Sequence, residues 1–201
     1  MSSTALRPRK ELILELAERH FAEHGFQGGS LSAIAREAGI QNPGLLHHFP
    51  SKEHLYRAVL EEQARDLAAR MHRRLAKSDG LAQRLTDFIS VQVEWMRVRP
   101  AGFRLITREL LDNSERMKTA QTRPLESFLQ EAQTLLQQAQ ATGLVRSDVS
   151  WLFALTLILG TLNYAKMVRP TLVAGFADEA LKTDKRWMAQ VQDDVLRVLR
   201  P

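Results

Sequence analysis

Polar side chains between Ser30 and Lys52 are closely spaced and are of types that can hydrogen-bond to DNA. Amide and imidazole groups can pair with base edges in the major groove, whereas hydroxyl and cationic groups can contact phosphate oxygens. The candidates near the base edges or the groove wall are Gln41, Asn42, Pro43, Gly44 and His47. The better candidates for phosphate contacts are Ser30, Ser32, Arg36, His48 and Lys52.

The first of two short helices expected to position these side chains begins after Ser30. The Ser30 hydroxyl can accept a hydrogen bond from a backbone N–H that the helix leaves unpaired. Gly39 follows the helix, at a place where a left-handed residue commonly ends one. The apolar residues that define a buried face recur at helical spacing, and they are Leu31, Ile34, Ala35 and Ala38.

The second helix follows the turn at Gly39 and the apolar Ile40. Gln41 or Asn42 can cap it, and Pro43 lies in its first turn, where a missing N–H costs nothing. Leu45 and Phe49 are four residues apart and face inward together. A helix–turn–helix of this size is the unit that places its second helix in the major groove of DNA.

A continuous set of residues from about Leu6 to Val59 carries a family resemblance. It comprises Ile13, Ala17, Phe21, Gly25 and Phe26, then Ile34-Ala35, Ala38-Gly39-Ile40, Leu45, His47 and Phe49, and finally Ser51-Lys52-Glu53-His54-Leu55. In these positions the chain resembles the DNA-binding domain of the tetracycline-repressor-like (TetR) family of transcriptional regulators. It departs from the usual family residues at Gln41, Leu46 and His48.

The resemblance implies an all-α protein with an N-terminal three-helix helix-turn-helix domain, a long connecting helix and a C-terminal helical bundle. It also implies a homodimer that binds a palindromic operator in double-stranded DNA. Members of the family are mostly repressors that a small-molecule effector releases from DNA. We therefore expect a DNA-binding domain over residues 6–66, with the helix-turn-helix motif at about 30–49. Residues 67–201 are expected to bind the effector and to dimerise.

The remainder of the chain is expected to be helical throughout, with breakers near Gly80, Pro100, Pro124, Gly143 and Pro170. The expected helices span residues 52–77, 81–97, 103–111, 124–142, 148–168 and 185–200. Ser147 is the expected cap of the helix that begins at Asp148. The helix over 52–77 links the two domains, so a ligand in the bundle could tilt it and release DNA.

The segment over 148–168 is the most apolar of all, and a helix that is apolar nearly all round is usually buried on two sides. A membrane span needs about 20 predominantly apolar residues, but Thr156, Thr161, Asn163 and Lys166 interrupt this one. We expect one side to pack within the chain and the other to pack on a second copy. The dimer contacts expected from this helix and the last one are Trp151, Leu155, Leu159, Leu162, Trp187, Val191, Val195 and Leu199.

Aromatic and polar residues of the bundle could line an effector pocket, although aromatic residues at helical spacing are more often plain core. The apolar candidates are Phe88, Trp95, Met96, Phe103, Phe128 and Tyr164. The polar candidates are Gln92, Thr107, Arg108 and Asn163. The pattern does not identify the effector.

Composition is that of an ordinary soluble protein, with 201 residues, 25% charged and 44% apolar. A net charge of +5 favours a polyanionic partner, but the basic residues are spread along the chain. The absence of cysteine excludes disulfides and thiolate metal sites. The N-terminal sequence MSSTALRPRKE lacks an apolar signal core, so we expect a cytoplasmic protein, and no cofactor or catalytic residue is expected.

Two alternatives remain open. His20, Glu23 and His24 fit the HxxEH pattern of inverted zinc proteases, which would make the chain a zinc hydrolase if a third ligand and a cleft were present. The other alternative is a helical interaction module whose helix-turn-helix binds protein. The polar, Pro-Gly start of the second helix argues against that interpretation.

Overall fold

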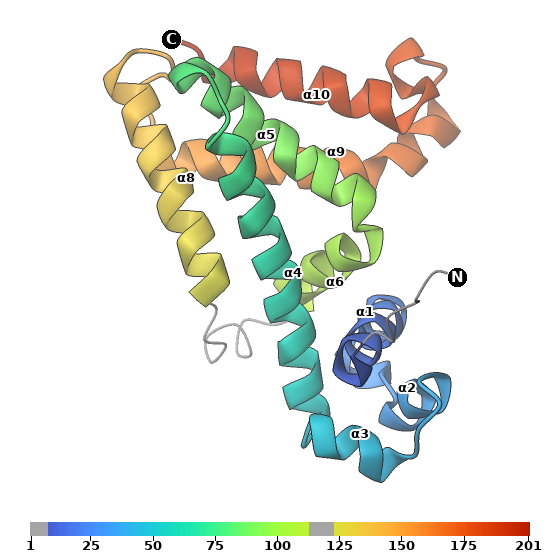
Figure 1. Cartoon of the computed structure of the whole chain (residues 1–201). Coiled ribbons are helices and arrows are strands. Elements are labelled where there is room, and N and C mark those ends of the chain that lie inside the picture. Colours follow the sequence, from blue (N-terminus) through green and yellow to red (C-terminus); the bar gives the residue numbers. More distant parts are fainter. Residues whose placement is uncertain (1–7, 113–122) are drawn as a thin grey trace, which may run out of the picture. The chain divides into compact units, whose positions relative to one another are not determined.

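The computed structural model describes residues 8–112 and 123–201 of the chain, and within these residues it contains helices and no strand (Figure 1). The all-α class expected from the sequence is confirmed. The α-helices span Arg9–Gly28 (α1), Leu31–Glu37 (α2), Asn42–His48 (α3), Lys52–Leu75 (α4), Gly80–Val98 (α5), Pro100–Asp112 (α6), Arg123–Ala141 (α8), Trp151–Gly175 (α9) and Asp184–Leu199 (α10). A short 3-10 helix, η1, spans Glu179–Lys182.

The chain divides into two compact units that are not contiguous in sequence. Unit 1 comprises residues 1–66 and 99–122, and unit 2 comprises residues 67–98 and 123–201. Helix α4 contributes its first part to unit 1 and its last turns to unit 2, and α6 belongs to unit 1. The sequence pattern gives no sign that a helix beyond residue 98 packs with the N-terminal helices.

Phe21 of α1 lies at 0% exposure in the core of unit 1. Its ring meets that of Tyr56 edge to face, with centroids 5.0 Å apart, and the ring of Phe26 also meets that of Tyr56 edge to face at 5.0 Å. Leu105 of α6 is fully buried in the same cluster, together with Leu45 of α3. This core therefore ties α1, α3, α4 and α6 into one body.

Polar contacts reinforce the packing of α6 on α1 and α4. Arg99 donates from Nη2 to Glu18 Oε2 at 2.7 Å and to Gln63 Oε1 at 3.1 Å. Tyr56 Oη donates to Glu109 Oε2 at 2.5 Å in a buried hydrogen bond. Glu18 is only 8% exposed, and burial raises the pKa of its carboxyl despite the opposing charge of Arg99. The guanidinium is thus the group that compensates a buried carboxylate.

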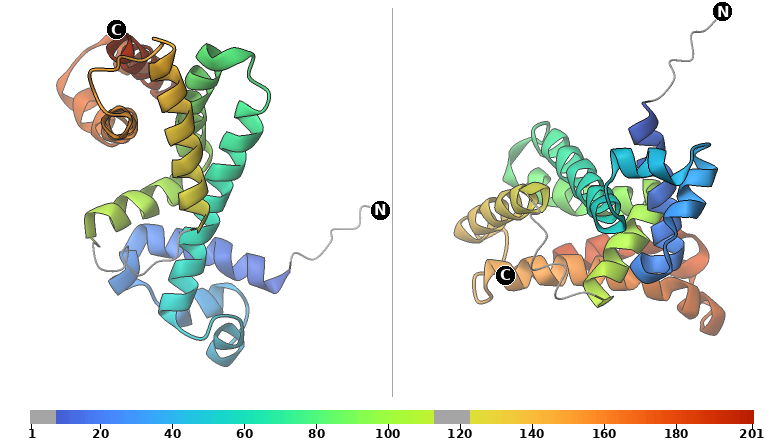
Figure 2. Two further views of the ribbon diagram at one scale, coloured as in Figure 1. Left: turned by 90° about the vertical axis from the view of Figure 1, so that its left-hand side faces the viewer. Right: turned by 90° about the horizontal axis from the view of Figure 1, so that it is seen from below.

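In unit 2, α8, α9 and α10 pack against α5, and α9 also packs against α8 and α10 (Figure 2). Trp187 of α10 donates from Nε1 to the carbonyl oxygen of Ala165 at 2.9 Å. Lys166 Nζ contacts both carboxylate oxygens of Asp184 at 2.7 Å. These bonds fix α10 along α9.

Two local predictions for α9 are wrong. The cap is Ser150, whose hydroxyl accepts from the backbone N–H of Phe153 at 3.1 Å. Asp148 instead pairs with Arg146, with Nε 2.6 Å from Oδ1, so the chain at Ser147 is still in the turn. Pro170 does not end the helix, which continues to Gly175. A proline on an exposed side of a helix can be tolerated when no packed neighbour depends on the bond that it removes.

Helix α9 is long and apolar enough to cross a membrane by length and composition alone, with a mean hydropathy of 1.4 in its most apolar window. One such helix is weak support for a membrane span, because the core helix of a globular protein passes the same test. Ala154, Leu155, Ile158 and Leu162 are buried in unit 2, but only 28% of that window is buried within the chain.

Replacing Arg99 with Met should lower the free energy of unfolding by about 2 kcal/mol, because it leaves the Glu18 carboxylate buried without its cation. Urea unfolding would measure the change. Arg104→Met, at an exposed position of α6, is the matched control and should cost less than about 0.5 kcal/mol. Equal losses in the two variants would contradict this role for Arg99.

Candidate nucleic-acid interface

The turn between α2 and α3 has the geometry expected from the sequence. Ser30 caps α2, and its Oγ accepts from the N–H of Ala33 at 3.2 Å. Gly39 has φ +68°, in the left-handed region. The N–H of Ile40 donates back to the carbonyl oxygen of Ala35 at 3.0 Å, as in a glycine-terminated helix end. A side chain at Gly39 would be strained by its backbone conformation, although no neighbouring atom lies within 4 Å of the position that its Cβ would take.

Helix α3 is anchored by two apolar residues and presents its other side to solvent. Leu45 is 0% and Phe49 4% exposed. Gln41, at the N-cap, and the first helical residues Asn42, Pro43 and Gly44 are all exposed. Leu46 is 41% exposed, and His47 beside it is exposed as well. This arrangement leaves a polar, accessible face on a helix whose orientation is fixed from behind.

Asn42 connects the two helices of the motif. Its Nδ2 donates to Ser32 Oγ at 2.8 Å, and both side chains are at the surface. The structure therefore brings together one residue expected near base edges with one expected near phosphate. Each still has hydrogen-bonding capacity, since an amide has two donors and a carbonyl acceptor.

The remaining phosphate candidates differ in their surroundings. Arg36 is exposed and His48 is half-buried. Lys52 is half-buried. Its Nζ donates to the carbonyl oxygen of Gln27 at 3.0 Å and lies 4.9 Å from the centre of the Phe26 ring. Its ammonium group thus holds the end of α1 against the start of α4. A second role at a phosphate would use its remaining donors.

Sequence reasoning missed the role of His20. Its Nε2 lies 2.9 Å from the backbone N–H of Ser30, so the ring accepts this hydrogen bond through an unprotonated Nε2. The His24 ring lies beside it, with centroids 4.6 Å apart. Burial lowers the pKa of His20, and the nearby His24 lowers it further. The neutral imidazole therefore fixes the start of α2, a contact that sequence spacing could not indicate.

The zinc-site alternative gains no support from this geometry. Zinc at Nε2 of His20 would have to displace the Ser30 N–H. Among the described residues no group of three or more His, Cys, Asp or Glu side chains is arranged to hold a metal ion.

The residues expected to line an effector pocket are divided between the two units. Phe103, Thr107 and Arg108 lie on α6 in unit 1, and the other seven lie in unit 2. Within unit 2 the rings of Phe88 and Phe128 are 6.0 Å apart. The buried members there are Phe88, Gln92, Trp95, Met96 and Phe128, whereas Tyr164 is 65% exposed.

The residues expected at a dimer interface are mostly enclosed by their own unit. Leu155, Leu162, Val191, Val195 and Leu199 are buried, and Trp151, Leu159 and Trp187 are half-buried. The large apolar residues of these helices that are exposed are different ones: Leu152, Phe153, Tyr164, Met167, Val173 and Val198. The sequence could not separate the two sides of α9, because both are apolar.

Comparison with known proteins relates the N-terminal segment to a family of regulators. Residues 13–59 match the family described as bacterial regulatory proteins, tetR family. The chain is 31% identical over 134 residues to the HTH-type transcriptional regulator RutR of Escherichia coli O157:H7, a match that covers 67% of this chain and 63% of RutR. It is 35% identical over 101 residues to the HTH-type transcriptional repressor AcnR of Corynebacterium diphtheriae, covering 49% of this chain and 50% of AcnR. The chain thus spans less than two thirds of either relative.

The fold of the whole chain also has known counterparts. The transcriptional regulator FadR from Bacillus subtilis, solved in complex with stearoyl-CoA, superimposes with a TM-score of 0.73 over 94% of this chain and 97% of FadR, at 19% identity. At this identity the likeness establishes a shared fold.

Protonation of His20 should weaken the folded state at mildly acidic pH. Its folded-state pKa lies below the ordinary 6.5, so the unfolded chain takes up the proton more readily. The stabilisation that the neutral His20 ring contributes is present above about pH 6.5 and is lost as pH falls through the folded-state pKa of His20. The melting temperature of the wild type should therefore fall between about pH 7.5 and 5.5 by more than that of His20→Gln.

Arg57→Gln, at an exposed position of α4, is the control because it removes no histidine. It should leave the pH dependence of the melting temperature as it is in the wild type. If the melting temperature of His20→Gln falls with pH as steeply as that of the wild type, protonation of His20 does not break a stabilising hydrogen bond to Ser30.

Proposed function

The chain belongs, through residues 13–59, to the tetR family of bacterial regulatory proteins, and from this premise we propose that it is a transcriptional regulator. It binds a palindromic operator in double-stranded DNA as a homodimer and acts as a repressor that a small molecule releases. It works in the cytoplasm and catalyses no reaction. The repressor role is what the family resemblance implies, and the relative AcnR is named as a transcriptional repressor.

The arrangement of α3 is the observation that supports DNA binding most directly. Leu45 and Phe49 are buried, while Gln41, Asn42 and His47 are exposed on the opposite side. Amide and imidazole groups on a rigidly mounted helix can read base edges in a major groove. In this proposal these three residues contact DNA bases. The residues that contact DNA phosphates are Ser30, Ser32, Arg36, His48 and Lys52.

Dimerisation is proposed because one short helix contacts few base pairs. A two-fold axis places two such helices on successive major-groove faces, about 34–36 Å apart. Helix α9 offers a surface for this contact, since Leu152, Phe153, Tyr164 and Met167 are 56%, 55%, 65% and 44% exposed. Exposed apolar side chains gathered on one helix are typical of an interface.

Regulation is proposed to act through the helices that join the two units. Helix α4 runs without interruption from unit 1 into unit 2, and α6 begins two residues after α5 ends. Arg99, at that junction, holds Glu18 of α1 and Gln63 of α4. A ligand that moves α5 would therefore act on the helices that carry the recognition helix, provided that it binds one arrangement more tightly. The FadR complex with stearoyl-CoA supports an effector in this fold.

A protein-binding role for α3 is the alternative. The two proposals differ in the partner of the exposed polar side chains, so selection of bound duplexes from a random DNA pool separates them. A palindromic consensus supports the regulator, and failure to enrich any sequence at moderate salt supports the alternative.

His47→Ala should weaken binding to the selected operator by about tenfold, because it removes one exposed polar contact of α3 worth roughly 1–3 kcal/mol. Fluorescence anisotropy at fixed salt would measure this. His72→Ala, an exposed histidine in unit 2, should bind with wild-type affinity. Unchanged affinity of His47→Ala would remove this residue from the interface.

Tyr164→Glu should convert the dimer to a monomer, because it places a charge in the apolar surface of α9. Light scattering after size exclusion would measure the mass. Tyr164→Phe should remain dimeric. Two results would contradict the assignment of this surface: a Tyr164→Glu protein that stays dimeric, or a wild type that is monomeric.

A further inference from the structure

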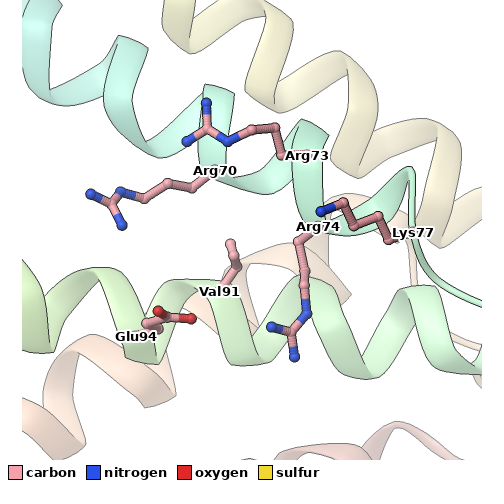
Figure 3. Close-up of a pocket in the computed structure, with 6 residues that line it drawn as sticks. All are labelled: Arg70, Arg73, Arg74, Lys77, Val91 and Glu94. Carbon is pink, nitrogen blue, oxygen red and sulfur yellow. The ribbon is translucent and has the colours of Figure 1, made fainter.

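A hollow on unit 2 between the end of α4 and the middle of α5 has a strongly basic lining. Its volume is about 290 Å³, and its lining residues are Arg70, Arg73, Arg74, Lys77, Val91 and Glu94. Figure 3 shows Arg70, Arg73 and Arg74 on α4, Lys77 just after its end, and Val91 and Glu94 on α5, with the Arg74 side chain extending across α5. None of these six residues belongs to the DNA-binding motif or to the expected effector set.

We propose that this hollow, named here the α4–α5 basic hollow, binds the phosphate groups of a small polyanionic ligand. The spacing of the four cations is the first argument. Arg73 and Arg74 follow Arg70 by three and four positions and so lie on the same side of α4 as Arg70, and Lys77 follows in the turn after α4. Like charges at this spacing repel one another, and a bound anion would reduce that repulsion.

The charge balance is the second argument. Basic residues in the last turn of a helix are favoured by its dipole, but that dipole is equivalent to only about half a charge. Glu94 contributes one negative charge to the lining. Asp87 contributes a second negative charge next to the lining, since Asp87 Oδ1 lies 2.9 Å from Arg74 Nε. The four cations outnumber these two carboxylates, so the lining as a whole keeps a net positive charge.

Arg74 is held in place for this role. Asp87 is 5% exposed and also accepts a hydrogen bond from Ser78 Oγ at 2.6 Å. Burial acts to raise the pKa of Asp87, but hydrogen bonds from Ser78, Arg74 and Gln83 outweigh it and lower that pKa. An ionised carboxylate therefore fixes the Nε edge of the guanidinium. A guanidinium fixed in this way can bind an anion with less loss of side-chain freedom.

The dimensions favour phosphates over a single carboxylate. Arg70 and Lys77 are seven positions apart, which corresponds to about 10 Å at the helical rise per residue, with Lys77 in the turn after α4. One carboxylate can pair with one guanidinium, whereas linked phosphates offer oxygens to several cations at once, in the forked geometry that arginine prefers. The volume of about 290 Å³ is sufficient for a diphosphate group and lies near the lower limit of about 300 Å³ for the pockets of drug-sized ligands.

Isothermal titration calorimetry of the full chain with inorganic pyrophosphate tests the proposal. Orthophosphate and acetate are the comparison anions, at low and constant ionic strength. We expect saturable binding of one pyrophosphate per chain, weaker binding of orthophosphate and none of acetate. Because the lining is largely exposed, the affinity should fall as salt is added.

The variant Arg73→Gln/Lys77→Gln should bind pyrophosphate at least tenfold more weakly. Lys185→Gln/Arg200→Gln removes the same charge from exposed positions of unit 2 and should bind as the wild type does. Circular dichroism checks that both variants are folded. Equal weakening in the two double variants, or equal heats for pyrophosphate and acetate, would overturn the proposal.

The cluster could instead contact DNA outside the operator-reading helix. If Arg73→Gln/Lys77→Gln loses affinity for a duplex of unrelated sequence while pyrophosphate fails to bind the wild type, the hollow is a DNA contact and the proposal is wrong. This inference does not depend on operator recognition, since pyrophosphate binding is measured without DNA.

Discussion

Burial of Leu45 and Phe49 in the core of unit 1 is the constraint on which the candidate DNA-binding surface depends. Helix α3 has seven residues, too few to be stable in water on its own. Its existence and its orientation are therefore set by these two anchors and by the glycine-ended turn before it. Because the anchors lie on one side only, the other side can carry polar groups without loss of stability. The contact between Asn42 and Ser32 then holds α3 to α2 at the surface.

The same core includes a helix that lies far along the chain. Leu105 of α6 is fully buried among the N-terminal helices, and Arg99 and Glu109 make the polar contacts that support it. At Gly102, an added Cβ would lie 2.2 Å from Gln63 Oε1, so α6 approaches α4 closely there. Helix α4 and the α5–α6 junction both pass from one unit to the other, so the chain joins the two units at both places.

Unit 2 presents two surfaces of opposite character. The open side of α9 is apolar, and hydrophobic burial against a second copy is the interaction that it favours. The α4–α5 basic hollow is charged, and its partner must be an anion. A bound anion and a second chain could therefore be accommodated by separate groups of residues, without competition for the same side chains.

The sequence by itself determined the local structure near the recognition helix, because short-range rules govern it. The cap at Ser30, the left-handed Gly39 and the inward Leu45 and Phe49 follow from hydrogen bonding and spacing within a few residues. The helical class and most helix positions followed from the same rules. The start of α9 was misplaced because Ser147 and Ser150 are both good caps, and only the turn formed by Arg146 and Asp148 distinguishes them.

Only the tertiary structure decided which distant residues meet. Helix α6 lies in unit 1, and His20 of the HxxEH pattern accepts a hydrogen bond from the backbone N–H of Ser30. Leu155, Leu162 and Val195 are buried in unit 2, whereas Tyr164 is exposed. Helical periodicity shows that a face is apolar, but it does not show which element covers that face. That choice depends on packing between segments that are remote in sequence, and no local pattern records it.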